Sequence, residues 1–196
     1  MMETINFLIA GVGGQGTVLA SDIMAAVGIE AGYDVKKSDI LGLAVRGGGV
    51  VGHVRWGEKV YSPILPEGRA DFLIAFEKLE CLRWLDQLKP NGKALVNLQK
   101  ILPVVVSSGL AKYPDDDQLE ETLKKATDTY YKIPAIDMAL EIGTSKTLNV
   151  VLLGSLSSLL EVEPEIWEKV IIERVPAKHK ETNLKAFRAG RNWMKG

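Results

Sequence analysis

A glycine cluster near the start of the chain is the sequence feature that most suggests chemistry. Gly11, Gly13, Gly14 and Gly16 lie in GVGGQG, which fits G-x-G-x-x-G between an apolar run and a helical pattern. Glycines at such a turn let backbone N–H groups approach an anion at the start of a helix. They also fit a turn that only allows a helix to pack closely on a strand. Both interpretations stay open, and Gln15 is unusual for a dinucleotide site because it places an amide where a pyrophosphate would lie.

Asp39 bears on whether this turn belongs to a dinucleotide site. In such sites an acidic side chain at the end of the second strand holds a ribose. Asp39 is near the expected place but follows Lys36, Lys37 and Ser38, so the match is loose. One hypothesis is therefore a free-standing NAD(P)- or FAD-binding Rossmann-type module or dehydrogenase. A dehydrogenase also needs a substrate domain and a proton donor, and 196 residues leave little room for them.

A second glycine-rich segment carries a single charge, Arg46. Arg46, Gly47, Gly48 and Gly49 follow the apolar and small residues 41–45. An arginine between glycines can approach a carboxylate or phosphate closely and contact it through two hydrogen bonds. An exposed flexible loop would be expected to carry more polar residues than this one. The pattern therefore favours an interface or a lid, in which Arg46, Gly47 and Gly48 face a ligand or a partner.

Two polar residues stand at the ends of expected strands, where the sites of α/β proteins gather. Glu77 follows an apolar run that is expected to be a strand, and Asn97 ends the next one. Both are candidate site residues, although Glu77 fits equally well as the N-terminal cap of a helix. His53 has no carboxylate close to it in the sequence, and Cys81 lies in an apolar helical stripe. Both are predicted to be structural.

The composition excludes several classes of function. Lys and Arg number 24 against 25 Asp and Glu, and a net charge of −1 argues against a nucleic-acid-coating protein. The single cysteine rules out a disulfide framework and an Fe–S cluster held by this chain alone, and two histidines leave little for a metal site, so none is expected. The N-terminus lacks the features of a signal peptide. Since no apolar stretch reaches the ~18–20 residues of a membrane span, the protein is expected to be cytoplasmic, without membrane contacts.

Strand and helix patterns alternate along one expected domain, residues 1–196. This alternation predicts an α/β fold, a Rossmann-like, mostly parallel sheet with helices on both faces. The segment 47–62 differs, because its alternation and its Gly57-Glu58 turn allow a β-hairpin insertion with antiparallel strands. Residues 39–49 are expected to form a loop. Strands are predicted at 5–10, 33–38, 50–56, 70–76, 94–97, 102–106 and 130–133. Helices are predicted at 18–27, 79–88, 115–126, 135–142, 146–160, 164–173 and 179–194.

At its two glycine motifs the sequence resembles the gamma subunits or domains of 2-oxoacid ferredoxin oxidoreductases, and among them the beta subunit of indolepyruvate ferredoxin oxidoreductase. GxGGQG followed at this distance by RGG is a more specific combination than either motif alone. The chain departs from the usual family pattern at Val45, Gly49 and Gly52. The resemblance covers nearly the whole chain and is carried by residues 11–21, 31–55, 61–83, 97, 134–143, 149–156 and 183–190.

The resemblance implies a non-catalytic or site-completing subunit of an enzyme that oxidatively decarboxylates a 2-oxoacid, indolepyruvate or another aryl pyruvate. That enzyme forms an acyl-CoA and passes electrons to ferredoxin. Thiamine diphosphate, magnesium and Fe–S clusters are then expected on a catalytic alpha-type partner subunit, because this chain has no GDG…N-type motif and no cysteine cluster. The chain is expected to bind none of them alone and to be inactive alone, while CoA is a co-substrate that it could help to hold. A homodimer stays open, and the cofactor- or partner-facing residues are Gly11, Gly13, Gly14, Gln15, Gly16, Arg46, Gly47, Gly48, Glu77 and Asn97.

Overall fold

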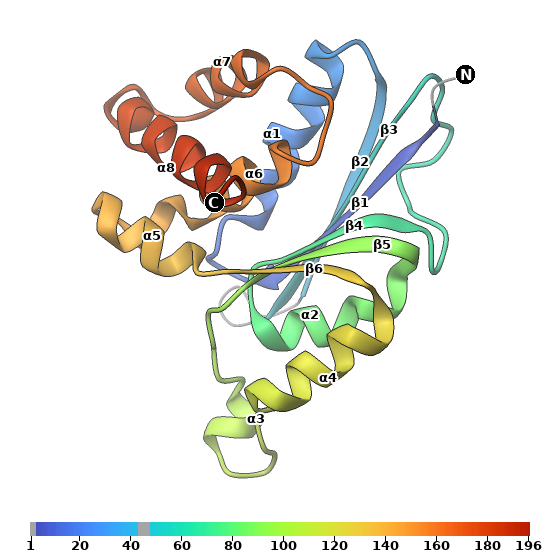
Figure 1. The fold of residues 1–196 in the computed structure, drawn as a ribbon, viewed down its shortest axis with the longest axis vertical. Coiled ribbons are helices and arrows are strands. Elements are labelled where there is room, and N and C mark those ends of the chain that lie inside the picture. Colours follow the sequence, from blue (N-terminus) through green and yellow to red (C-terminus); the bar gives the residue numbers. More distant parts are fainter. Residues whose placement is uncertain (1–2, 43–47) are drawn as a thin grey trace.

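The computed structural model describes residues 3–42 and 48–196. In this part of the chain, six strands form one sheet in the order β2-β3-β1-β4-β5-β6 (Figure 1). The strands are β1 (Ile5–Val12), β2 (Asp34–Leu41), β3 (Gly49–Gly57), β4 (Ala70–Ala75), β5 (Leu88–Asn97) and β6 (Thr129–Ile133). The helices are α1 (Thr17–Glu30), α2 (Lys78–Trp84), α3 (Val104–Ser107), α4 (Asp116–Ala126), α5 (Ala135–Ile142), α6 (Leu148–Ser157), α7 (Pro164–Arg174) and α8 (Lys180–Trp193). Short 3-10 turns are η1 (Leu85–Gln87), η2 (Ser145–Thr147) and η3 (Ala177–His179).

The sheet is mostly parallel, as the alternation of strands and helices predicts. Strands β1, β4, β5 and β6 run parallel to one another. Strand β3 is reversed, because it pairs antiparallel with β1 on one side and with β2 on the other. The carboxyl ends of the parallel strands therefore meet at one edge of the sheet, where sites of open α/β folds form.

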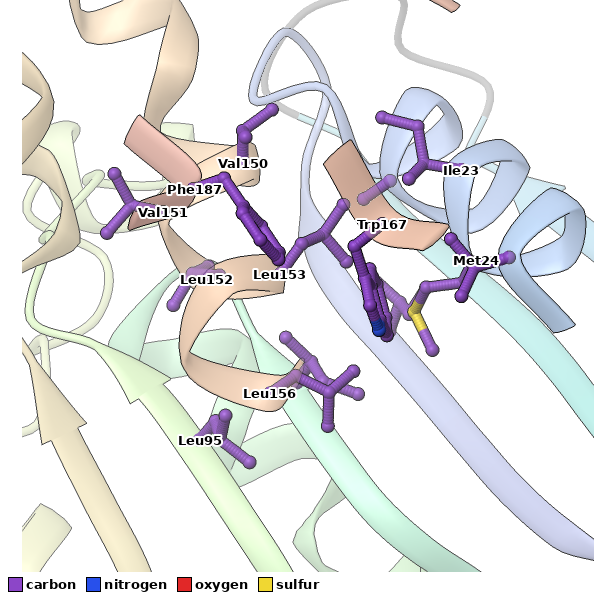
Figure 2. Packing of buried hydrophobic residues seen from close by; sticks show 14 of the residues in the cluster. Ile23, Met24, Leu95, Val150, Val151, Leu152, Leu153, Leu156, Trp167 and Phe187 are labelled. Atoms are coloured by element: carbon purple, nitrogen blue, oxygen red, sulfur yellow. The ribbon is translucent and has the colours of Figure 1, made fainter. Parts of the chain in front are cut away.

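Each face of the sheet has its own hydrophobic core. Alternate residues of a strand point to opposite faces, so Phe7 and Ile9 join one cluster while Leu8 and Ala10 join the other. Helices α1, α5, α6, α7 and α8 cover the first face, and α2 and α4 cover the second (Figure 1). Figure 2 shows Trp167 of α7 beside the apolar side chains of α6 and Met24 of α1. Helices on both faces confirm the predicted architecture.

Helices α6 and α8 cross in direct backbone contact. A Cβ atom at Gly154 would lie 2.1 Å from the Phe187 carbonyl oxygen, and one at Gly190 would lie 2.0 Å from the Val151 carbonyl oxygen. The Ser155 hydroxyl also donates to the Gly190 carbonyl across the crossing, at 3.2 Å. Only glycine permits this approach, so these two positions set the distance between α6 and α8.

The predicted hairpin around residues 47–62 is wrong, although antiparallel pairing does occur there. From Gly49 to Gly57 the chain forms one strand, β3, and residues 58–62 leave the sheet instead of returning along it. Both edges of β3 are already paired, with β1 and β2, so no edge is free for a returning strand. The departing segment is held instead by Arg55, whose guanidinium donates to the Ser62 carbonyl oxygen at 3.0 Å. Residue 47 lies outside the described residues.

Other predicted elements also differ from the structure, and three of the differences have a clear physical reason. Residues 102–106 were expected to be a strand, but they contain α3, which starts after Pro103 and leaves Val104 85% exposed. Strand β2 continues to Leu41, into the expected loop, because it pairs with β3 as far as Val50. Strand β5 already begins at Leu88, whereas a strand was expected only from residue 94. In each case pairing with a distant strand, or its absence, overrides the local pattern.

Candidate functional site

The glycine turn joins the end of β1 to the start of α1. Gly14 and Gly16 have φ angles of 102° and 81°, a region that glycine enters without strain. A Cβ atom at Gly14 would meet nothing within 4 Å, whereas one at Gly11 would lie 2.6 Å from Thr17 Cγ2. The turn therefore combines both interpretations of the motif. Gly11 lets the helix pack closely on the strand, and Gly14 leaves the backbone open.

The structure brings the two glycine motifs together. The Gly13 N–H donates to the Gly48 carbonyl oxygen at 2.9 Å, so the turn after β1 is bonded to the segment that leads into β3. Two other residues of the second motif, Arg46 and Gly47, lie outside the described residues. The contact with Gly48 places the start of β3 beside the turn, as expected if both motifs serve one site.

Gln15 does not project from the turn as its place at the tip suggested. Its side chain is only 7% exposed and folds back towards the sheet. The Val12 N–H donates to Gln15 Oε1 at 2.8 Å, and Gln15 Nε2 donates to the Phe76 carbonyl oxygen and to Gln99 Oε1, each at 2.8 Å. The amide thus leaves the outer side of the turn clear and ties the turn to the ends of β4 and β5.

Asn97 completes the same amide cluster at the end of β5. Its side chain is fully buried, and Nδ2 donates to the Phe76 carbonyl oxygen at 2.8 Å. Its Oδ1 accepts from the Ile136 N–H at the start of α5, at 3.2 Å. Asn97 therefore connects three elements and acts on the cavity described below through its neighbours.

Glu77 lies on the other side of the sheet and caps α2. Its fully buried carboxylate accepts hydrogen bonds from the Leu79 N–H at 2.6 Å and the Glu80 N–H at 3.0 Å. It also accepts from the Ile101 N–H at 2.9 Å and from the Tyr113 hydroxyl. Burial and the bond to this carboxylate raise the pKa of Tyr113 above its usual range, so Tyr113 stays a proton donor. Glu77 therefore holds the segment from Ile101 to Tyr113 against the sheet.

A cavity of about 500 Å3 opens beside the glycine turn. The carboxyl ends of β1 and β5 and the starts of α1, α5 and α6 surround it. Among its lining residues the one charged side chain in the described part of the chain is Lys146, which is exposed. A cavity next to the first turns of two helices and one lysine suits an anion. Its lining residues are Gly13, Gly14, Gln15, Gly16, Leu19, Gln99, Ile101, Ile136, Ser145, Lys146, Leu148 and Asn149.

Sequence reasoning missed most of the residues that line this cavity, among them the polar residues Gln99, Lys146 and Asn149. Gln99 follows Asn97 by two positions, so the rule that selected Asn97 could have been extended to it. Lys146 and Asn149 start a helix far along the chain, and no local pattern connects them with the turn. Asn149 is 1% exposed, and its Nδ2 donates to the Gly16 carbonyl oxygen at 3.3 Å.

Asp39 is not placed to hold a ribose at the turn. Strand β3 lies between β1 and β2, which moves Asp39 one strand further from the turn than in a dinucleotide site. Its carboxylate accepts from the Ser21 hydroxyl at 2.7 Å and pairs with Lys37 at 2.7 Å. The acidic companion of a dinucleotide-binding turn is therefore engaged elsewhere, which weighs against the dinucleotide hypothesis.

Cys81 and His53 are structural, as predicted. Burial raises the pKa of the Cys81 thiol to about 12, so it is protonated at neutral pH. His53 is 7% exposed, its Nδ1 accepts from the Leu65 N–H at 3.3 Å, and burial lowers the pKa of its imidazole. Among residues 3–42 and 48–196, no group of three or more His, Cys, Asp or Glu side chains could hold a metal ion. In the same part of the chain, no helix has the length and apolar character to cross a membrane.

Comparison with known proteins agrees with this architecture. The family model described as pyruvate ferredoxin/flavodoxin oxidoreductase matches residues 6–193. The chain is 38% identical to indolepyruvate oxidoreductase subunit IorB of Thermococcus kodakarensis, over 96% of this chain and 95% of that protein.

Two solved structures share the fold. The gamma subunit of a keto/oxoacid ferredoxin oxidoreductase from Geobacter sulfurreducens superposes with a TM-score of 0.73 at 27% identity, covering 97% of this chain and 98% of that one. A 2-oxoglutarate:ferredoxin oxidoreductase from Magnetococcus marinus has a TM-score of 0.78 at 21% identity, where the match covers 98% of this chain but 31% of the longer one. With nearly its whole length matched by the family model, the chain belongs to the pyruvate ferredoxin/flavodoxin oxidoreductase family.

Proposed function

We propose that the chain is the small, site-completing subunit of a 2-oxoacid:ferredoxin oxidoreductase that acts on indolepyruvate or another aryl pyruvate. In this reaction a 2-oxoacid and CoA yield an acyl-CoA and CO2, and two electrons pass to ferredoxin. The observation that carries the proposal is the end-to-end similarity, 38% identity over 96% of this chain, to a protein named as a subunit of indolepyruvate oxidoreductase. A likeness over the whole length supports the same role for the whole chain.

The redox cofactors are assigned to the partner subunit because the residues of this chain do not fit them. An Fe–S cluster needs several thiolates, and the single cysteine, Cys81, is buried and protonated. Thiamine diphosphate and its magnesium need a diphosphate motif that the sequence lacks. When bound on a catalytic alpha-type subunit, these groups supply the decarboxylation and the electron transfer. This chain then contributes binding and shape.

The cavity beside the glycine turn is the part of this chain that we assign to CoA. It has room for a substantial part of such a ligand at about 500 Å3. Lys146 and the first turn of α1 offer positive charge to phosphate oxygens. Because Gly14 has no side chain and open space around it, an anionic group can approach the backbone directly. Lys146 and the turn from Gly13 to Gly16 thus bind and orient the co-substrate.

An exposed apolar surface near the same edge of the sheet supports a role as a subunit. Large hydrophobic side chains stand out from the end of β2 and from the segment around α3, which projects at the bottom of Figure 1. Such a surface is typical of one that another chain covers. Arg46 lies between the end of β2 and β3 in the sequence, and we assign it to the same interface. The exposed residues are Ile40, Leu41, Leu102, Val104, Val105 and Leu110.

Reconstitution tests the proposal directly. The chain is expressed with and without the catalytic alpha-type subunit, and reduction of ferredoxin or a viologen dye is followed with aryl pyruvate and CoA. We expect both chains to co-purify and to be required together, and the small chain alone to be colourless and inactive. Full activity of the catalytic subunit without this chain would refute the proposal. Stoichiometric binding of NAD(P) or FAD to the isolated chain would instead favour the dinucleotide hypothesis.

A further inference from the structure

Gln99 stands where the amide cluster behind the glycine turn meets the cavity. Its Oε1 accepts hydrogen bonds from Gln15 Nε2 at 2.8 Å and from Asn97 Nδ2 at 3.5 Å. The same residue is part of the cavity wall, together with Gly13 to Gly16 and Lys146. Gln99 is therefore in contact with the interior on one side and with the cavity on the other.

The orientation of the Gln99 amide follows from groups whose roles are unambiguous. A backbone N–H can only donate, and a backbone carbonyl oxygen can only accept. Gln15 bonds to the Val12 N–H through Oε1 and to the Phe76 carbonyl through Nε2, which fixes its orientation. Asn97 is fixed in the same way by the Ile136 N–H and the Phe76 carbonyl. Both side chains thus present amino groups to Gln99, and only an oxygen of Gln99 can accept from them.

The Gln99 amino group must then face away from the cluster. No hydrogen bond to another described residue involves Gln99 Nε2. This atom is also not one of the buried side-chain nitrogens that lack a partner, which in the described part of the chain are Trp56 Nε1 and Trp167 Nε1. An amino group that is neither bonded nor buried is accessible to solvent, and Gln99 lines the cavity beside the glycine turn. Two buried amides thus determine that the cavity wall offers a donor at this point. A donor beside Lys146 is complementary to an oxygen that carries negative charge.

We infer that Gln99 is a specificity-determining residue, which donates from Nε2 to an anionic oxygen of the ligand in this cavity. Gln15 and Asn97 act as positioning residues that set this polarity. The inference rests on the proposed function, since it deepens the assignment of the cavity to CoA. The oxygen belongs to a phosphate of CoA or to the carboxylate of the 2-oxoacid, and both accept hydrogen bonds in the same way.

Gln99→Glu is the sharpest perturbation, because the new carboxylate has nearly the same shape. One of its oxygens still accepts from Gln15 and Asn97, while the other presents an acceptor and a negative charge to the cavity. Gln118→Glu is the matched control, with the same change of charge at an exposed position on α4. The kinetic constants for CoA and for the 2-oxoacid are measured with the reconstituted complex. Isothermal titration of the full chain alone with CoA and with inorganic pyrophosphate gives a readout that needs no activity.

We expect Gln99→Glu to raise KM for CoA at least tenfold, with kcat and the KM for the 2-oxoacid within about twofold of the wild type. Pyrophosphate and CoA should bind the variant chain at least tenfold more weakly, and Gln118→Glu should change nothing. An increase confined to the KM of the 2-oxoacid would keep the donor role and assign it to the carboxylate. The inference would be overturned if Gln99→Glu left both the KM values and the binding constants unchanged. It would also be overturned if the wild-type protein bound neither CoA nor pyrophosphate in the titration and showed no dependence on CoA in the kinetic assay. A third outcome separates the two proposals. If the reconstituted wild-type complex does not oxidise a 2-oxoacid, but the wild-type chain binds pyrophosphate and the Gln99→Glu chain does not, only the proposed function fails.

Discussion

Gln15→Glu tests the amide cluster that connects the glycine turn to the sheet. The substitution keeps the shape of the side chain but replaces a donor by an acceptor. The Val12 N–H keeps its partner, whereas the Phe76 carbonyl and Gln99 Oε1 each lose a donor at 2.8 Å and face a carboxylate oxygen instead. The site is only 7% exposed, so water cannot compensate fully.

The expected loss follows from these contacts. Two hydrogen bonds are worth about 1 kcal/mol each, and a poorly solvated carboxylate facing two oxygens adds about 1–3 kcal/mol. The free energy of unfolding should fall by about 3–5 kcal/mol at pH 8. For a chain of this size that lowers Tm by roughly 6–20 °C. Thermal and urea unfolding followed by circular dichroism measure the change, and Gln118→Glu, in the capping box of α4, should stay within about 0.5 kcal/mol of the wild type.

The pH dependence gives an independent check. Burial and the facing oxygens raise the pKa of the introduced carboxyl above its unfolded value of about 4.3. Between the two pKa values the folded variant binds more protons than the unfolded chain, so its stability falls as pH rises through that window. The deficit relative to wild type should therefore be smaller at pH 5 than at pH 8. A variant as stable as wild type at pH 8, or a deficit independent of pH, would refute the arrangement of the cluster.

Three further outcomes are expected. Arg46→Ala should leave the isolated fold intact but lower kcat/KM of the reconstituted enzyme roughly 10- to 100-fold. Arg46→Lys should recover only part of this activity, because lysine lacks the planar guanidinium. Wild-type rates for Arg46→Ala would show that Arg46 has no role in the site. Gly154→Ala should cost about 3 kcal/mol or more in urea unfolding, since its Cβ would lie 2.1 Å from the Phe187 carbonyl oxygen and the gain of ~1 kcal/mol in helix propensity cannot offset that. Cys81 should react slowly with a thiol reagent at pH 8 and quickly in guanidinium chloride, because burial raises its pKa to about 12; rapid reaction of the native protein would contradict its burial.

The local sequence pattern was sufficient to predict secondary structure and burial where a residue interacts mainly with its own helix, strand or turn. The strand, turn and helix from Ile5 to Glu30 are readable because apolar runs, glycines and helical spacing act over a few residues. The same holds for α5 and α7, which were predicted within a residue of their observed bounds. Burial of Cys81 followed from its place in an apolar stripe.

What the sequence by itself determined was the class of fold, the position of the glycine turn and the absence of ligands for an Fe–S cluster. The tertiary structure decided that β3 is inserted antiparallel between β1 and β2, because strand order depends on pairing between distant segments. It also decided the site, in which Gln15 bonds to Gln99, 84 positions away, and Asn149 reaches Gly16 across 133 positions. Hydrogen-bond polarity is a property of such assembled contacts, so the direction of an amide could be determined only after the partners on other elements were in place.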